Sequence, residues 1–167
     1  HETSTGTLQN YHMPLGIGVI AEFLKLHLKD YSLNLNLFKR PTVLGDYLEQ
    51  NIPDVLLLSS YLWNEKLSLH YAKIVKAMNP ECLIIMGGPN VSLRIEKREE
   101  FLRLNPCIDV LVIGDGEIIS EKLVREFLSG SSIKEVKNKK FANCYSVDHI
   151  SEIFMIGLDE DFRLGLG

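Results

Sequence analysis

Three short apolar runs alternate with stretches of helical pattern, and this arrangement restricts the fold more than any other feature of the sequence. The runs occupy residues 55–59, 82–86 and 108–113. Their apolar residues follow one another without alternation, which is typical of strands that helices cover on both faces. Parallel strands are connected by helical stretches of the length seen here. We therefore predict an α/β fold: a doubly wound, mostly parallel sheet flanked by helices.

The stretches around the runs carry apolar residues at helical spacing and are joined by short segments rich in proline, glycine and asparagine. Helices are predicted over residues 14–29, 43–50, 67–78, 94–104 and 119–130. Leu33, Leu35 and Leu37 alternate with polar residues. This period of two predicts a further strand with one wet face, near an edge of the sheet.

The composition fits one globular domain and argues against several classes of protein. With 167 residues, of which 46% are hydrophobic, the chain can bury a core without disulfides. The formal net charge is −4, and no strong basic cluster lies outside residues 134–140. No apolar run approaches the roughly 18 residues that a membrane span requires. We therefore expect a protein that binds neither nucleic acid nor membranes.

The cysteines and the ends of the chain give expectations about compartment and domains. Cys82, Cys107 and Cys144 are odd in number and far apart, which suits reduced thiols better than a disulfide framework. Residues 1–13 lack the features of a secretory signal, so we expect a cytoplasmic protein. We expect one domain over residues 1–133. The remaining residues, 134–167, would form a connector or the start of a following domain, with a solvated lysine-rich stretch at 134–140 and one strand at 153–156.

Small residues follow each of the three apolar runs: serines after the first, and glycines after the second and third. The tips read Ser-Ser-Tyr-Leu-Trp-Asn at 59–64, Gly-Gly-Pro-Asn-Val-Ser at 87–92 and Gly-Asp-Gly-Glu at 114–117. Parallel strands present their carboxyl ends at one edge of a sheet, so we predict that these tips converge. Glycines let the backbone approach a bulky or phosphate-bearing ligand, and hydroxyls supply donors without bulk. The tips therefore predict a ligand site.

The tips belong to a longer series of motifs in a fixed order. The series adds Pro-Leu-Gly-Ile-Gly at 14–18, Pro-Asp-Val at 53–55 and Ile-Asp-Val at 108–110. In this order the motifs resemble the cobalamin-binding domain that precedes the catalytic core of many radical S-adenosylmethionine enzymes, over residues 14–128. Asp115 stands where that family usually has glutamate. The strand that should precede the first helix is not visible in residues 1–13. We expect either that it lies before residue 1 or that residues 1–13 supply it in a register that their pattern does not show.

The resemblance implies a Rossmann-like or flavodoxin-like domain that binds cobalamin. The catalytic core, with S-adenosylmethionine and a 4Fe-4S cluster, would lie outside this chain and carry out methyl transfer or related radical chemistry. The chain itself would then hold no catalytic residue. The implied cofactor-binding residues lie at the start of the first helix and at the tips: Pro14, Leu15, Gly16, Ser59, Ser60, Tyr61, Trp63, Asn64, Gly87, Gly88, Pro89, Val91, Gly114, Gly116 and Glu117.

The histidines bear on how cobalt would be held. Another large class of cobalamin domains supplies a cobalt ligand from an Asp-x-His-x-x-Gly motif, and none of the five histidines here stands in that pattern. His12 lies in the loop before the first helix, where such a ligand would come from. We expect that no side chain of the protein binds the cobalt. His12 is the one candidate for such a ligand.

Two alternatives remain open at this point. Gly16-x-Gly18-x-x-Ala21 fits a dinucleotide fingerprint, and Lys39-Arg40 could meet the 2′-phosphate of NADP. Residues 3–7 are similar to a flavin phosphate loop. The chain could then be an NADP- or flavin-binding module of an oxidoreductase, or a cofactor-free interaction domain of the same fold. Against the fingerprint, the pattern of the sequence puts both glycines inside the first predicted helix.

Overall fold

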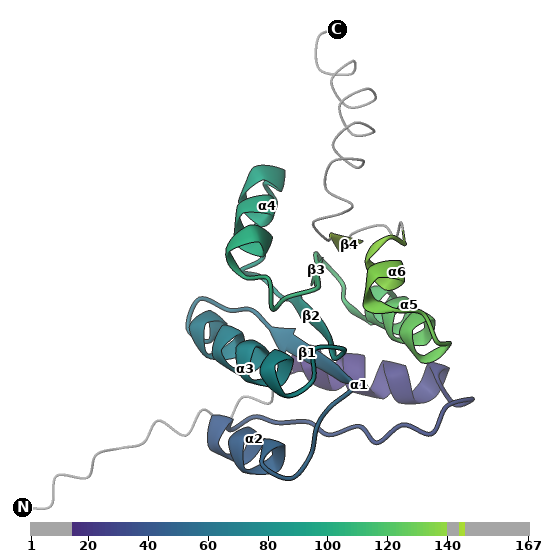
Figure 1. The fold of residues 1–167 in the computed structure, drawn as a ribbon. Coiled ribbons are helices and arrows are strands. Elements are labelled where there is room, and N and C mark those ends of the chain that lie inside the picture. Colours follow the sequence, from purple (N-terminus) through teal and green to yellow (C-terminus); the bar gives the residue numbers. More distant parts are fainter. Residues whose placement is uncertain (1–14, 140–143, 146–167) are drawn as a thin grey trace, which may run out of the picture.

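The computed structural model describes residues 15–139 and 144–145 (Figure 1). The helices are α1 (Leu15–His27), α2 (Pro41–Leu48), α3 (Glu65–Met78), α4 (Ile95–Leu104), α5 (Glu117–Leu128) and α6 (Ile133–Lys137). The strands are β1 (Val55–Ser59), β2 (Leu83–Gly87), β3 (Val110–Val112) and β4 (Cys144–Tyr145). Among the described residues, no helix is long and apolar enough to span a membrane.

One sheet with the order β1-β2-β3-β4 forms the centre of the fold. Strands β1, β2 and β3 are parallel, with Val55 opposite Leu83 and Ser59 opposite Gly87. Strand β4 pairs antiparallel with β3. The predicted mostly parallel, helix-flanked sheet is therefore confirmed, and the three predicted strands are present within one or two residues of their expected bounds. β1, which we expected at the centre, lies at one end of the sheet among the described residues.

Helices cover both faces of the sheet, as Figure 1 shows for α5 and α6 on one side and α3 and α4 on the other. Leu83 and Ile85 of β2 belong to the core that α1, α5 and α6 cover. Ile84 and Met86 belong to the core that α2, α3 and α4 cover. Successive side chains of a strand point to opposite faces. This double burial explains why β2 is apolar at every position from 83 to 86.

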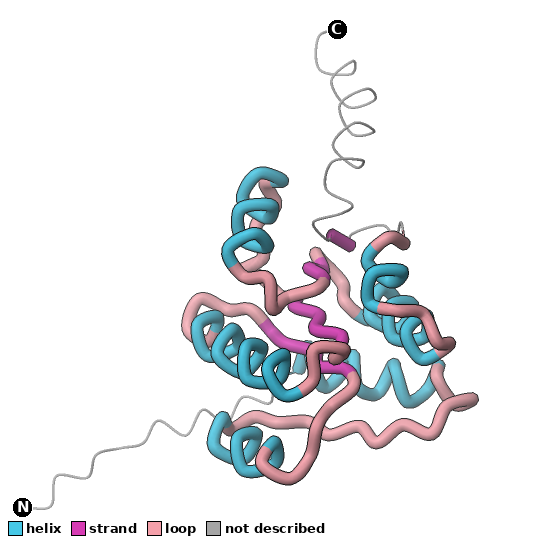
Figure 2. The backbone as a smooth tube through the Cα atoms, viewed as in Figure 1, coloured by secondary structure: helices cyan, strands magenta, loops and turns pink. Residues whose placement is uncertain are grey.

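The strand predicted around residues 33–37 is wrong. This segment has no ladder partner among the described residues and forms part of the irregular connection between α1 and α2 (Figure 2). Leu33 and Leu35 do pack against the core under α1, whereas Leu37 is 46% exposed. The alternating pattern therefore indicated one-sided burial correctly. It could not predict pairing, because a strand also requires a neighbouring strand at hydrogen-bonding distance.

The lysine-rich stretch that we expected to be solvated contains a helix instead. Ser132 caps α6: its side chain accepts a hydrogen bond from the Glu135 N–H, while the Glu135 carboxylate accepts one from the Ser132 N–H. Val136 is fully buried in the core that α1 and α5 share. A single apolar residue among lysines was too weak a signal to predict this contact. The strand expected at 153–156 lies outside the described residues.

A buried ion pair joins α3 to the starts of two strands, at the edge of the sheet opposite the tips. The Lys76 Nζ lies 2.8 Å from the Asp109 Oδ2. Lys76 also donates to the Cys82 carbonyl at 2.8 Å, and Asp109 accepts from the Ile84 N–H at 2.8 Å. Burial raises the pKa of the neighbouring Cys82 thiol to about 12, although Lys76 lowers it in part. Cys82 is therefore a packing residue rather than a reactive thiol.

Candidate functional site

The three predicted tips meet at the carboxyl edge of the sheet. β1, β2 and β3 are parallel, so their last residues lie side by side. The Ser60 N–H donates to the Gly87 carbonyl at 2.6 Å, and the Asn90 N–H donates to the Ser60 carbonyl at 3.1 Å. A β-carbon on Gly87 would lie 3.4 Å from the Val112 carbonyl oxygen. The expected convergence of the three loops is confirmed.

The first turns of α1 and α5 lie at the same edge. A β-carbon on Gly116 would lie 2.9 Å from the Ile20 Cδ1 in α1. A β-carbon on Gly16 would lie 4.0 Å from the Tyr61 hydroxyl. The start of α1 is therefore brought together with the tips that follow β1 and β3. Leu15 is 70% exposed beside this edge, and Pro14 lies outside the described residues.

A stacked aromatic pair, half-buried Tyr61 and exposed Trp63, lies on the tip that follows β1. The rings of Tyr61 and Trp63 are stacked, with centroids 4.8 Å apart and an interplanar angle of 17°. Trp63 is 79% exposed and its neighbour Leu62 is 85% exposed. Large apolar side chains that are exposed to solvent at the end of a sheet are typical of surfaces that bind a ligand or a partner protein. The pair supplies a flat, apolar wall.

The polar side chains of this tip shape the loop itself. The Asn64 Oδ1 accepts from the Tyr61 N–H at 2.8 Å, and its Nδ2 donates to the Ser59 Oγ at 3.1 Å. The Ser68 hydroxyl donates to the Ser59 carbonyl at 3.0 Å. Ser59 and Asn64 thus turn inward, although the resemblance implied that they contact a ligand. Their hydrogen bonds hold Tyr61 and Trp63 at the surface.

Two glycines at the tips have a backbone conformation that other residues rarely adopt. Gly88 has a φ of +118°, and a β-carbon there would lie 2.8 Å from the Ser60 carbonyl oxygen. Gly114 has a φ of +73°, and a β-carbon there would meet no atom within 4 Å. Gly88 is therefore required by contact with the neighbouring loop. Gly114, in contrast, leaves backbone open to whatever lies against the edge.

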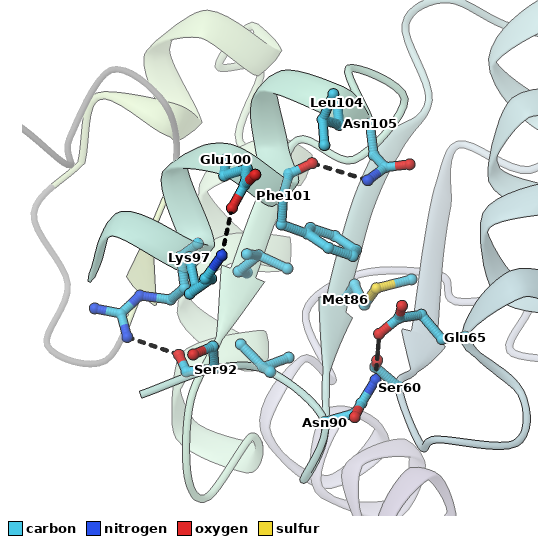
Figure 3. A pocket seen from close by; sticks show the side chains of 13 residues that line it. Ser60, Glu65, Met86, Asn90, Ser92, Lys97, Glu100, Phe101, Leu104 and Asn105 are labelled. Atoms are coloured by element: carbon cyan, nitrogen blue, oxygen red, sulfur yellow. Dashed lines mark hydrogen bonds and ion pairs between the residues drawn. The ribbon is translucent and has the colours of Figure 1, made fainter. Parts of the chain in front are cut away.

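A carboxylate that our sequence analysis did not select lies between the first two tips (Figure 3). The Ser60 hydroxyl donates to the Glu65 Oε2 at 3.2 Å, and the Asn90 Nδ2 donates to the same oxygen. Ser60 is 1% exposed. Glu65 opens α3, where a carboxylate interacts favourably with the helix dipole, whereas the helix predicted from the sequence began only at residue 67. Its partners on two loops could not be seen without the structure.

These three residues also form one wall of a cavity of about 280 Å³ beneath α4. Met86, Phe101 and Leu111 line the rest of it with apolar side chains, and Val91 lies at its edge. The Lys97–Glu100 ion pair closes the far side, as Figure 3 shows. Among the predicted ligand residues, Ser60 and Val91 therefore face the α4 side of the sheet.

The remaining predicted residues are accessible from the edge. Pro89 is exposed, and Glu117 occupies the first turn of α5. His27 lies at the far end of α1, stacked on Phe23, and His70 lies within α3. Within residues 15–139 and 144–145, no three His, Cys, Asp or Glu residues are grouped so that they could hold a metal ion. His12 lies outside the described residues.

The dinucleotide fingerprint is not built as a phosphate turn. Gly16 and Gly18 both lie inside α1, which begins at Leu15. A fingerprint glycine has to form the tight turn between a strand and the helix that follows. The helical conformation of both glycines therefore argues against NADP binding at this motif.

The sequence is similar to proteins of known families. The B12 binding domain family matches residues 3–124. The 2-(S-pantetheinyl)-carbapenam-3-carboxylate methyltransferase of Streptantibioticus cattleyicolor is 35% identical over 97 residues, which is 55% of this chain and 14% of that protein. The cobalamin-dependent radical SAM methyltransferase TokK of Streptomyces tokunonensis is 39% identical over 77 residues, 46% of this chain and 11% of that protein. An uncharacterized methyltransferase of Pyrococcus horikoshii is 37% identical over 65 residues, which is 39% of this chain and 14% of that protein. The matched region is thus 11% to 14% of the length of these relatives.

Proposed function

The chain belongs to the B12-binding domain family, and we propose that it is the cobalamin-binding module of a radical S-adenosylmethionine enzyme. The observation that carries this proposal is the meeting of three loop tips, two of which contain glycines, with the exposed Trp63 stacked on Tyr61 at one edge of the sheet. The similarity to TokK, a cobalamin-dependent radical SAM methyltransferase, supports the reaction class. In this proposal the catalytic core, with S-adenosylmethionine and the 4Fe-4S cluster, lies outside the 167 residues.

The residues at the edge fit a large, flat and largely apolar cofactor. The open backbone at Gly114 and the exposed ring of Trp63 both leave room for one. In our proposal Tyr61 and Trp63 form one wall, Gly87 and Gly88 flank the nucleotide tail, and Gly116 with its neighbours closes the opposite wall. Bound cobalamin would supply a cobalt that carries a methyl group or an electron. The contribution of this chain is binding and orientation.

We expect Trp63→Ala to weaken cobalamin binding by about tenfold, since it removes one exposed ring of a stacked pair. Its 79% exposure means that the fold does not depend on it. Binding is measured by equilibrium dialysis with hydroxocobalamin, followed by cobalamin absorbance. In the wild-type protein, quenching of Trp63, the only tryptophan, gives a second readout.

Leu26→Ala is the matched control for this titration. Leu26 is also a large exposed side chain, at 59%, but it lies near the far end of α1. We expect the Leu26→Ala variant to bind hydroxocobalamin with the same dissociation constant as the wild type. A wild-type protein that does not bind cobalamin, or that responds to NADP or FMN instead, would exclude the proposed function.

We further propose that no imidazole of this chain binds cobalt, and that the nucleotide base of the cofactor is displaced into the groove beside the Ser59 and Gly87 tips. Neither described histidine lies on a tip loop. The expected result is a cob(II)alamin paramagnetic resonance spectrum of the reconstituted protein without nitrogen coupling on the lower face. Nitrogen coupling that disappears in His12→Ala would instead identify His12 as a ligand. Coupling that persists in that variant would point to a retained base or another histidine, and would equally contradict the proposal.

The domain bounds and the compartment are also part of this proposal. We expected the domain to end at residue 133. Because Val136 packs into the same core as α1 and α5, we propose that the module extends through α6 and that the following residues form the connector to the catalytic core. Cys82 and Cys107 are free and buried. Free thiols accord with a reducing compartment, and we propose the cytoplasm.

A further inference from the structure

Three side chains join the first two tips, and we call Ser60, Glu65 and Asn90 the clasp. One carboxylate oxygen of Glu65 accepts from the Ser60 hydroxyl on the loop after β1 and from the Asn90 amide on the loop after β2. Two backbone hydrogen bonds run beside it, from Ser60 to Gly87 and from Asn90 to Ser60. The two loops are thus held by both main chain and side chains.

The position of Glu65 is unusual for a residue that would only stabilise its helix. A glutamate in the first turn can face solvent and still interact favourably with the helix dipole, as exposed Glu96 does at the start of α4. Glu65 is half-buried instead and turns toward the loops, as Figure 3 shows. The Glu65 Oε2 accepts hydrogen bonds from the buried Ser60 hydroxyl and from the Asn90 amide, and both donors would lose this partner without it.

The clasp also fixes the surroundings of Gly88. A β-carbon on Gly88 would lie only 2.8 Å from the Ser60 carbonyl oxygen, so the two loops are in close contact at this point. A change in their spacing would move Tyr61, which follows Ser60, and Pro89, which precedes Asn90. Both are residues that we place against cobalamin. The side chains of the clasp therefore control the distance between Tyr61 and Pro89, two parts of the surface that we place against cobalamin.

We propose that Glu65 and Asn90 are positioning residues of the cobalamin site, which hold the loops after β1 and β2 at the spacing that the cofactor requires. This inference rests on the proposed function. Neither residue needs to touch the cofactor. Their effect is preorganisation: loops that are already ordered cost less free energy to bind a ligand than loops that must be ordered on binding.

Exchanging the donor and the acceptor of the clasp tests this role. Asn90→Asp places two carboxylates against each other, and at pH 8 we expect the dissociation constant for hydroxocobalamin to rise about tenfold or more. Glu65→Gln/Asn90→Asp restores one donor and one acceptor in reversed order: the Gln amide nitrogen donates to the Asp carboxylate, and the Ser60 hydroxyl can accept from its second N–H. We expect this double variant to bind within about twofold of the wild type.

Glu96→Gln is the matched control, because Glu96 also lies in the first turn of its helix, α4, but faces solvent; we expect no change in binding. All variants are compared well below their melting temperatures, with hydrogen exchange of the peptides that contain Ser60 and Asn90 as a second readout. Asn90→Asp is expected to speed exchange at these peptides, and the double variant to slow it again.

The outcomes separate the two proposals. If the wild-type protein does not bind cobalamin, the proposed function fails. If it binds and Asn90→Asp binds equally well, or if the double variant regains thermal stability and slow exchange without regaining affinity, the clasp is structural only and the inference is overturned.

Discussion

Replacing Asp109 by alanine is expected to destabilise the protein by about 3 kcal/mol. The change leaves the Lys76 ammonium without its anion and the Ile84 N–H without its acceptor. Breaking a buried ion pair typically costs about 3–5 kcal/mol. We place the effect at the lower end because the Lys76 side chain keeps 18% of its exposure, against 7% for Asp109. Urea unfolding followed by circular dichroism measures the change.

The exposed Lys97–Glu100 pair provides the control for this experiment. Its side chains are 60% and 47% exposed, so water and salt screen the interaction. Glu100→Ala should leave the urea midpoint close to that of the wild type. Lys76→Met/Asp109→Leu should recover much of the loss, because removing both charges leaves none uncompensated in the core. Equal midpoints for Asp109→Ala and the wild type would refute the structural role of this pair.

Gly88→Ala is expected to cost about 3 kcal/mol of stability and to abolish tight cobalamin binding. A φ of +118° is essentially restricted to glycine, and such strain costs about 1–3 kcal/mol. The new methyl group would also lie 2.8 Å from the Ser60 carbonyl oxygen. That carbonyl cannot withdraw easily, since it accepts a hydrogen bond from the Asn90 N–H. Urea unfolding and equilibrium dialysis measure the two effects.

Gly114→Ala separates backbone strain from steric overlap. Gly114 also has a positive φ, but a β-carbon there meets no atom within 4 Å. We expect this variant to lose about 1–2 kcal/mol, the cost of a left-handed conformation alone. If Gly88→Ala is no worse than Gly114→Ala, the two loops can separate freely, and the close contact between them does not constrain the wall.

The pattern of the sequence predicted the central part of the fold well. The unbroken apolar runs at 55–59 and 82–86 predicted strands covered on both faces; β2 is buried in this way, whereas β1, at one end of the sheet, is half-buried. The prediction failed where one sequence pattern is compatible with two structures, a paired strand or an unpaired segment buried on one side. Leu33 and Leu35 alternate because one side of their segment is buried, yet no ladder forms in the described residues. It also failed at α6, where a single residue, Val136, decides the packing.

The edge that carries the candidate site followed from strand direction alone. Parallel β1, β2 and β3 necessarily bring their carboxyl ends together, and the tips were predicted to meet for that reason. Which tip residues would face outward did not follow. Trp63 is exposed, whereas Ser60 is buried and Asn64 bonds within its own loop. The orientation of a loop side chain depends on turn geometry that residue types alone do not specify.

Hydrophobic periodicity shows which faces of each element are buried, so the class of fold and the edge of the sheet that carries the candidate site could be predicted from the residues alone. Which polar groups meet could be seen only in the folded chain. The contacts of Glu65 with Ser60 and Asn90, and of Lys76 with Asp109, join different loops and elements. Hydrogen bonds and ion pairs are short and directional, so they depend on register and on distances of a few ångströms that no local pattern encodes.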